Sequence, residues 1–414
     1  MGFNQGLSGL NSASKNLDVI GNNIANTSTV GFKASRAEFS DVYAASLYGM
    51  SSLDVGIGSK VAAVAQQFTQ GNISATNNPL DIAISGEGFF QLDQNGLTTY
   101  TRNGQFQMDK DGYIVDNAGR NLTGNLATAT GVVIGGPPVS LQVSLGVAPP
   151  NATTTALLTA NLNSTSSTSA AVIDPAIPST YNYTTTFTVY DGAGVAQGLT
   201  LFFQKNAANS WTAAGYVGGT AAGNQVGLNG AAPSNATLVF DPATGALDAT
   251  VGLNGAAPTA IAGIALGTGT FSLDLATLTQ YGSASGVSFV SQDGYSSGQF
   301  ASLSVDKTGL LQGRYTNGQT LILGQVLMTN FLNPNGLQPL GDNQWAETAA
   351  AGKQNSGAPG SGVLGYLQSG AVEDSNVDLT AELVNMIVAQ RMYQANAQTV
   401  KTQDSILQTL VNLR

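Results

Sequence analysis

Residues 371–414 form a long stretch that contains neither glycine nor proline. Within it, positions spaced alternately by four and three residues, from Leu379 to Val411, are apolar or aromatic at eight of ten places. This spacing predicts a helix with one apolar face, and Asn376 or Asp378 can cap its start. A helix of about 36 residues would be roughly 54 Å long. Because that exceeds what a small domain buries, the pattern favours a coiled coil.

A second stripe with the same spacing lies near the other end of the chain, from Phe3 to Ile24. Heptad helices at both ends predict that the ends pair with each other or with further copies of the chain. Because one pair of narrow stripes is marginal in water, we expect these helices to order fully only on association. The residues expected at the assembly interface are Leu7, Leu10, Leu17, Ile20, Ile24, Leu383, Ile387, Tyr393, Val400, Leu407 and Leu410.

The middle of the chain has no helical signal and very little charge. Lys205 is the one basic residue between positions 121 and 306. Turn dipeptides such as Asn95-Gly96 recur seven to eight residues apart, between short runs of β-branched and aromatic residues. These features predict β-meanders, and further strands are expected at 183–190, 199–205 and 210–216.

Changes in composition divide the chain into nested parts. The predicted fold class is multidomain α+β, with terminal coiled-coil helices enclosing two mainly-β domains, the outer one inserted into the inner one. The expected parts are a helical terminal domain (1–28 and 374–414), a connector (29–70 and 364–373), an inner β domain (71–146 and 286–363) and an inserted outer β domain (147–285).

One octapeptide, VGLNGAAP, occurs twice, at residues 226–233 and 251–258. A solenoid needs about three or more repeats. We therefore expect a local duplication of a strand-and-turn unit.

Two absences exclude whole classes of chemistry. The chain contains no histidine and no cysteine. It therefore has no thiol nucleophile, no imidazole acid or base, and no thiolate or imidazole metal ligand. The net charge of −10 argues against nucleic-acid binding. We expect a protein that is not an enzyme and that has no catalytic, cofactor or metal site.

Membrane insertion and a cleavable secretory signal are also not expected. No apolar run approaches the roughly 18 residues of a membrane span. The first basic residue is Lys15, so no positive segment precedes an apolar core. The chain is expected to be cytoplasmic, or exported by a route that reads no such signal.

Three motifs call for a choice between a site and a plain structural role. Asp109, Asp111 and Asp116 surround a glycine, but their spacing does not match an EF-hand, so a hairpin turn is expected. The segment GIGSK at 56–60 lacks the spacing of a phosphate-binding loop. Glu373 and Asp374 precede the C-terminal helix and are expected to serve as capping charges.

Longer motifs resemble the flagellar rod and hook protein family. At the N-terminus, residues 17–33 read LDVIGNNIANTSTVGFK; at the C-terminus, residues 375–387 read SNVDLTAELVNMI. Internal matches include NPLDIAISGEGFF at 78–90 and NPNGL at 333–337. Together these motifs cover most of residues 1–125 and 287–414. The segment from Phe187 to Trp211 is similar to the outer domain of hook members, which the shorter rod members lack.

The resemblance implies a structural subunit that stacks into a hollow, flexible helical homopolymer, joining rod to filament and transmitting motor torque. The implied partners are further copies, the distal rod protein, the hook cap and hook–filament junction proteins, and the flagellar type III export apparatus. The implied location is extracellular, in the flagellum, without signal-peptide cleavage. Two alternatives remain: a distal rod protein with an enlarged insert, and an adhesive, carbohydrate-binding β protein.

Overall fold

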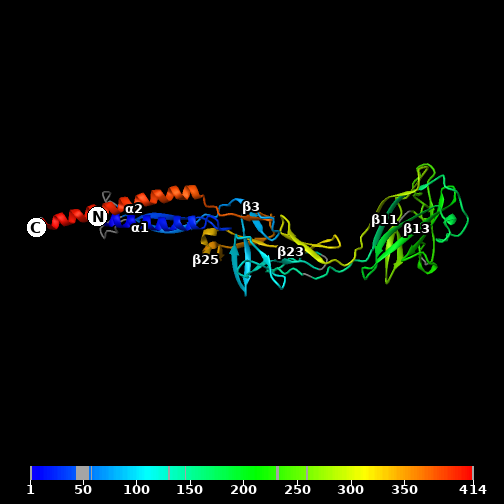
Figure 1. The fold of residues 1–414 in the computed structure, drawn as a ribbon, viewed down its shortest axis with the longest axis horizontal. Helices are drawn as coiled ribbons and strands as arrows, with labels where there is room; N and C mark the ends of the chain where they lie inside the picture. The colour runs from blue at the N-terminus through cyan, green and yellow to red at the C-terminus, as the bar shows by residue number, and fades with distance from the viewer. Residues whose placement is uncertain are drawn as a thin grey trace. The chain divides into compact units, whose positions relative to one another are not determined.

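The computed structural model describes residues 2–42, 56, 58–128, 131–144, 146–229, 233–257 and 260–412 (Figure 1). The side chain of Leu410, residues 54, 55 and 57 beside and within the glycine-rich loop, and parts of both octapeptides lie outside this description. The chain forms two compact units. The first contains residues 1–145, 301–314 and 320–414, and the second contains residues 146–300 and 315–319.

The predicted terminal helices are both present in the first unit. Helix α1 (Gly2–Ala25) and helix α2 (Leu379–Asn412) contact each other, and they are the two α-helices of the described residues. Asp378 caps α2, since its Oδ1 accepts hydrogen bonds from the backbone N–H groups of Thr380 (2.9 Å) and Ala381 (3.1 Å). Among the described residues, neither helix is apolar over enough of its length to cross a bilayer. The rest is mostly β, so the predicted fold class is confirmed.

The connector contains a hairpin that the sequence analysis does not predict. Strands β1 (Ser35–Val42) and β2 (Gly58–Gln66) pair antiparallel and contact α1. Only Ala37 of β1 is fully buried. Because small and polar residues fill both faces, the period-two alternation that identifies a half-buried strand is missing.

The main sheet of the first unit has 13 strands. Its β5–β6 hairpin turns at Asn95 and Gly96, whose φ angles are +55° and +87°, as the predicted Asn-Gly turn requires. The strands are β5 (Phe89–Gln94), β6 (Leu97–Thr101), β7 (Gln107–Met108), β8 (Ile114–Val115), β9 (Asn121–Leu126), β10 (Val139–Ser140), β21 (Phe300–Val305), β22 (Leu310–Tyr315), β23 (Thr320–Val326), β24 (Met328–Phe331), β25 (Gln338–Gly341), β26 (Gln344–Ala346) and β27 (Gln354–Gly357).

Two short pairs join early and late parts of the chain. Strand β3 (Ile73–Ala75) pairs with β29 (Ala371–Glu373), and β4 (Ile82–Ser85) pairs with β28 (Tyr366–Ser369). The segment that leads into α2 is thereby held against the segments that follow strand β2 in the sequence.

Two of the three aspartates that distantly resemble a calcium loop, Asp109 and Asp116, accept backbone hydrogen bonds within turns. Asp109 Oδ1 accepts from the N–H groups of Asp111 (2.9 Å) and Tyr113 (2.8 Å). Asp116 pairs with Arg120 at 2.7 Å. These contacts fit the expected hairpin turn. Within the described residues, no three acidic side chains gather as a metal site would need.

The aromatic core of the first unit includes Tyr100, whose pKa is raised. The Tyr100 hydroxyl donates to Gln354 Oε1 at 2.8 Å and to Glu347 Oε2 at 3.4 Å, and its ring packs edge-on against Phe331. Burial, reinforced by the Glu347 carboxylate, raises the pKa of Tyr100 from 10.0 to about 12.

This shift predicts a loss of stability in alkali. Between the two pKa values the unfolded tyrosine releases its proton while the folded one keeps it, so stability falls as pH rises. The loss is about 2 kcal/mol by pH ~12. Urea unfolding of the first unit at pH ~9.5 and ~11.5 measures it, and Tyr100→Phe should remove this fall. An equal fall in both proteins would contradict the assignment.

The second unit is a sandwich of two five-stranded sheets that share one core. The three predicted strands are confirmed as β12, β13 and β14. One sheet contains β11 (Thr155–Asn163), β17 (Ile261–Leu266), β18 (Gly269–Asp274), β19 (Thr279–Tyr281) and β20 (Gly286–Gln292); the other contains β12 (Tyr183–Tyr190), β13 (Ala196–Ala207), β14 (Ser210–Val217), β15 (Gln225–Val226) and β16 (Ala236–Val239).

Both octapeptides contribute to that core. Leu228 of the first copy and Leu253 of the second are buried in it. The Asn254 side-chain amide donates to the Leu228 carbonyl at 2.8 Å. The two copies therefore pack on each other, as a local duplication would.

Candidate assembly surface

Helices α1 and α2 run antiparallel and approach each other closely at two glycines (Figure 1). A Cβ on Gly6 would lie 2.9 Å from Val400 Cγ2, and one on Gly9 would lie 2.8 Å from the Asn396 side chain. At the other end of the pair, Asn23 Nδ2 donates to Glu382 Oε1 at 3.1 Å. Small residues on α1 therefore set the spacing of the helix pair.

The predicted interface residues fall into two groups. Ile20 is buried, and Leu10, Leu17, Ile24 and Val400 are partly buried. The remaining predicted residues with described side chains are exposed: Leu7, Leu383, Ile387, Tyr393 and Leu407.

The α2 side that faces α1, the inward stripe, coincides with the predicted stripe only at Met386, Ala397 and Val400. The described α2 side chains that are at least partly buried are Glu382, Met386, Ala389, Asn396, Ala397, Val400 and Gln403. Apart from Ala397, their spacing also fits alternating steps of four and three, but three of the seven are polar. Counting apolar residues therefore does not identify this stripe.

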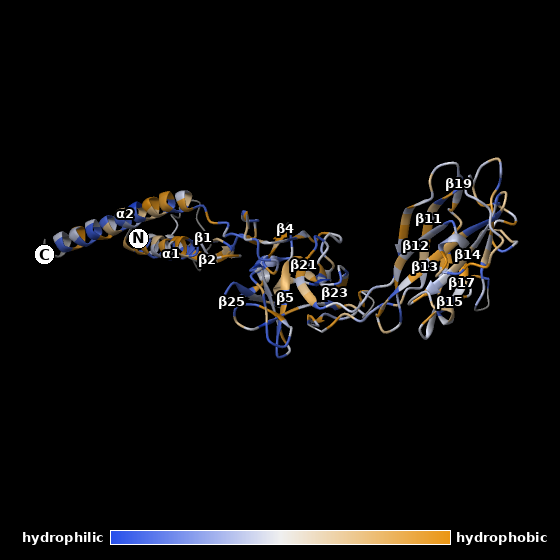
Figure 2. Ribbon diagram, turned by 45° about the vertical axis from the view of Figure 1, so that its right-hand side comes forward, coloured by the Kyte–Doolittle hydropathy of each residue, from blue (hydrophilic) through white to orange (hydrophobic). Residues whose placement is uncertain are grey.

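Apolar residues lie on every side of the first half of α2, with polar residues such as Thr380, Asn385 and Arg391 between them. We call its exposed apolar residues the α2 apolar surface, and Figure 2 shows the hydrophobic colour on this part of the helix. A helix with apolar residues on every side is normally buried. These residues are instead exposed, and nothing in the described chain covers them. The α2 apolar surface consists of Leu379, Leu383, Val384, Ile387, Val388, Met392 and Tyr393, with 38–56% of each exposed.

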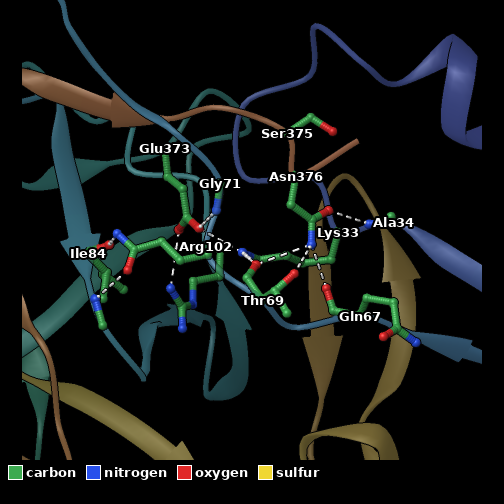
Figure 3. A network of polar contacts seen from close by, with 12 residues as sticks. Lys33, Ala34, Gln67, Thr69, Gly71, Ile84, Arg102, Glu373, Ser375 and Asn376 are labelled. Carbon is green, nitrogen blue, oxygen red and sulfur yellow. Dashed lines mark hydrogen bonds and ion pairs between the residues drawn. The ribbon is translucent and has the colours of Figure 1, made fainter. Parts of the chain in front are cut away.

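A buried cluster of charged side chains links the segment that follows α1 to the segment that precedes α2 (Figure 3). Glu373 lies at the end of β29. Its carboxylate oxygens form ion pairs with Lys33 Nζ, at 2.7 Å, and with Arg102 Nη1, at 3.2 Å, and all three side chains are at most 3% exposed. The Gly71 N–H also donates to Glu373, at 2.9 Å, and Lys33 donates to the Thr69 carbonyl at 2.7 Å. The prediction that Glu373 is a capping charge is therefore wrong, since its carboxylate points into this cluster instead.

The cluster has one carboxylate for two cations. Burial lowers the pKa of Lys33, and the Glu373 carboxylate partly opposes this effect. Burial likewise lowers the pKa of Arg102, again against the attraction of Glu373. Glu373 is thus the counter-charge that both buried cations depend on.

Asn376 adds a second link beside the cluster. Its side-chain oxygen accepts from the Ala34 N–H at 2.7 Å, and its amide donates to the Gln67 carbonyl at 2.7 Å. The residue proposed as an alternative helix cap therefore fixes the start of α2 to the segments on either side of the β1–β2 hairpin.

Four protein-family models match the chain. They are the flagella basal body rod protein (residues 3–33), the flagellar hook protein FlgE/F/G D1 domain (83–154), the flagellar basal body protein FlaE D2 domain (161–295) and the flagellar basal body rod FlgEFG protein C-terminal region (368–413).

Relatives match the chain over nearly its whole length. The chain is 43% identical over 424 residues to the flagellar hook protein FlgE of Salmonella typhimurium, covering 100% of both chains. It is 42% identical to that of Escherichia coli K12, again over 100% of both, and 31% identical to that of Borreliella burgdorferi over 99% of this chain and 98% of the relative.

The fold is also similar to a solved structure, the crystal structure of Helicobacter pylori flagellar hook protein FlgE2. The TM-score is 0.52 at 13% identity, over 72% of this chain and 100% of that one. Identity of 42–43% over the full length of two of these relatives shows the family. The chain belongs to the flagellar hook protein family, the structural subunits of the hook of the bacterial flagellum.

Proposed function

We propose that copies of this chain assemble through their helical ends into the hollow, bendable tube of the hook, which joins rod to filament and transmits torque. The observation that carries the proposal is the α2 apolar surface, which nothing in the described chain covers. In a tube, the helices of neighbouring copies would cover it. The terminal helices would form the inner wall, and the β domains, with the boundaries given above, the outer layers.

The energetics support association. Burying one Leu-sized side chain contributes roughly 1.5–3 kcal/mol. Leu383, Ile387 and their exposed neighbours are each only partly covered in the single chain. Several such residues per copy, repeated around a helical lattice, can stabilise an assembly although each contact is modest.

The composition of the second unit suits surfaces that slide against those of neighbouring copies. The unit contains a single basic residue, Lys205, which is itself buried. Breaking a buried ion pair costs about 3–5 kcal/mol. A surface poor in charge forms few such pairs with its neighbours, so copies can shift past one another as the tube bends.

The remaining elements of the proposal concern partners and location. The distal rod protein, the hook cap and hook–filament junction proteins and the flagellar type III export apparatus are the partners we propose. The chain would leave the cell without signal-peptide cleavage and would act as a structural protein, not a catalyst. It would bind no nucleic acid and insert in no membrane.

A charge on the α2 apolar surface tests this function. We expect Leu383→Asp combined with Ile387→Asp to raise the concentration needed for polymerisation at least about 100-fold, since two contacts of a few kcal/mol are lost. Sedimentation and electron microscopy of the purified full chain measure it. Gln398→Asp with Thr402→Asp, two exposed polar positions of the same helix that lie beyond the α2 apolar surface, is the matched control. Normal tubes from the Leu383/Ile387 variant would contradict the proposal.

A further inference from the structure

The end of α2 extends past its partner helix. Gly6 of α1 faces Val400, so α1 begins close to the level of Gln403. Residues 404–409 are all exposed, including Ile406 (51%) and Leu407 (54%). We call residues 404–412 the overhang; Figure 1 shows it running beyond the start of α1.

The overhang has the pattern of an amphipathic helix, whose apolar face normally packs against a partner. Apolar residues stand at 406, 407, 410 and 411, and polar residues stand at 404, 405, 408, 409 and 412. At 100° per residue, these two sets occupy opposite faces of two helical turns. No residue of α1 is available to cover the apolar face.

A groove runs along the other part of the same helix pair. Two adjoining pockets, of about 290 and 370 Å³, share Asn16 and Met392 and lie between α2 and the β1–β2 hairpin, with α1 as the floor. Gly9 and Ala13 are small residues and leave space above α1, while Phe39 (42% exposed) and Met392 (55%) form apolar sides of the groove. The groove extends from Glu382 to Asn396, about 21 Å along the helix.

We propose that this groove receives the overhang of a second copy of the chain. The overhang is roughly 13 Å long and fits within the groove. The part of the groove around Ala13, Phe39 and Met392 is the more apolar one, and an amphipathic helix laid in such a groove is a common mode of recognition. A chain cannot fill its own groove, since Leu407 lies about 16 Å along a continuous helix from Asn396 at the groove end.

The pairing explains why assembly would continue. Groove and overhang are different surfaces, so each copy that binds leaves one of each free. Such a heterologous contact builds an open helical polymer when its rotation does not close a ring, whereas a self-complementary contact would stop at a dimer. The inference rests on the proposed function, because it names the partner that part of the helical surface takes.

Disulfide trapping tests the proposal, and the absence of natural cysteine makes the result unambiguous. Full-length Leu407→Cys and Phe39→Cys chains are mixed, polymerised and oxidised. A disulfide needs Cα atoms within about 7 Å, so a mixed dimer reports contact between copies. We expect at least about ten-fold more dimer than from the control pair, Leu407→Cys with Gln398→Cys, whose second position lies on the far side of α2 from the groove.

A second measurement does not depend on the trapped pair. Leu407→Asp should raise the polymerisation concentration at least about ten-fold, whereas Gln408→Asp, on the polar face of the overhang, should change it less than about two-fold. Tubes that form without the Leu407–Phe39 dimer, or that tolerate Leu407→Asp, would overturn this inference and leave the proposed function standing. Failure of the unmodified chain to form tubes would instead refute the proposed function.

Discussion

Replacing Glu373 with glutamine is expected to lower the free energy of unfolding of the first unit by about 3–5 kcal/mol. Lys33 and Arg102 are buried, and Glu373 is the carboxylate that both contact. Removing its charge leaves two cations without a counter-charge in a site that water does not reach. A loss of this size is a large part of the 5–15 kcal/mol that typically stabilises a domain.

The two tryptophans allow the loss to be located. Trp345 is buried in the first unit and Trp211 in the second. Chemical unfolding of Glu373→Gln in a Trp211→Phe background therefore follows the first unit, and the Trp345→Phe background follows the second. Glu373→Gln should lower the denaturant concentration at the midpoint of the unfolding transition reported by Trp345, and should leave the transition reported by Trp211 unchanged.

Asp374→Asn is the matched control for Glu373→Gln. Asp374 is the next residue and is also acidic, but it is only partly buried and its side chain bonds to Ser74 at the surface. We expect a change below about 1 kcal/mol, as for exposed polar contacts. Equal losses of unfolding free energy in the two variants would show that the buried cluster does not stabilise the first unit more than a surface contact does.

Enlarging both glycines of the helix pair should separate α1 from α2. In Gly6→Leu/Gly9→Leu, new side chains would occupy space that Val400 and Asn396 now fill. Overpacking costs typically about 1–3 kcal/mol per site. We expect the double variant to lose tube formation, as measured by electron microscopy, while the second unit unfolds as before.

Gly21→Leu is the control for the glycine variant, because nothing lies within 4 Å of a Cβ at that position of the same helix. Leucine is the better helix former by up to about 1 kcal/mol. Gly21→Leu should therefore assemble normally. If all three leucine substitutions behaved alike, close packing at Gly6 and Gly9 could not be what holds the helices together.

The sequence predicts best what depends on neighbours along the chain. The cap at Asp378, the turn at Asn95-Gly96 and the strand over Tyr183–Tyr190 each follow from a few adjacent residues. The charge cluster could not be predicted in this way, because Lys33 and Glu373 are 340 positions apart. On sequence alone, Glu373 is indistinguishable from a charge that caps the next helix.

The candidate interface was predictable only in part, for a related reason. Apolar residues surround the first half of α2, so two stripes with the same spacing compete there. The stripe that contacts α1 includes Glu382 and Asn396, whose roles depend on Asn23 and Gly9 of the other helix. The predicted residues Leu383 and Ile387 lie outside that stripe, on the exposed surface that we propose neighbouring copies cover.

Thiol labelling at Ile387 most directly tests whether neighbouring copies cover the α2 apolar surface. In an otherwise cysteine-free chain, Ile387→Cys replaces a side chain that is 51% exposed in the single copy. Maleimide should react with it at least about ten-fold more slowly in tubes than in monomers, as expected for a group buried by assembly. Equal rates in monomers and in intact tubes would contradict the proposal.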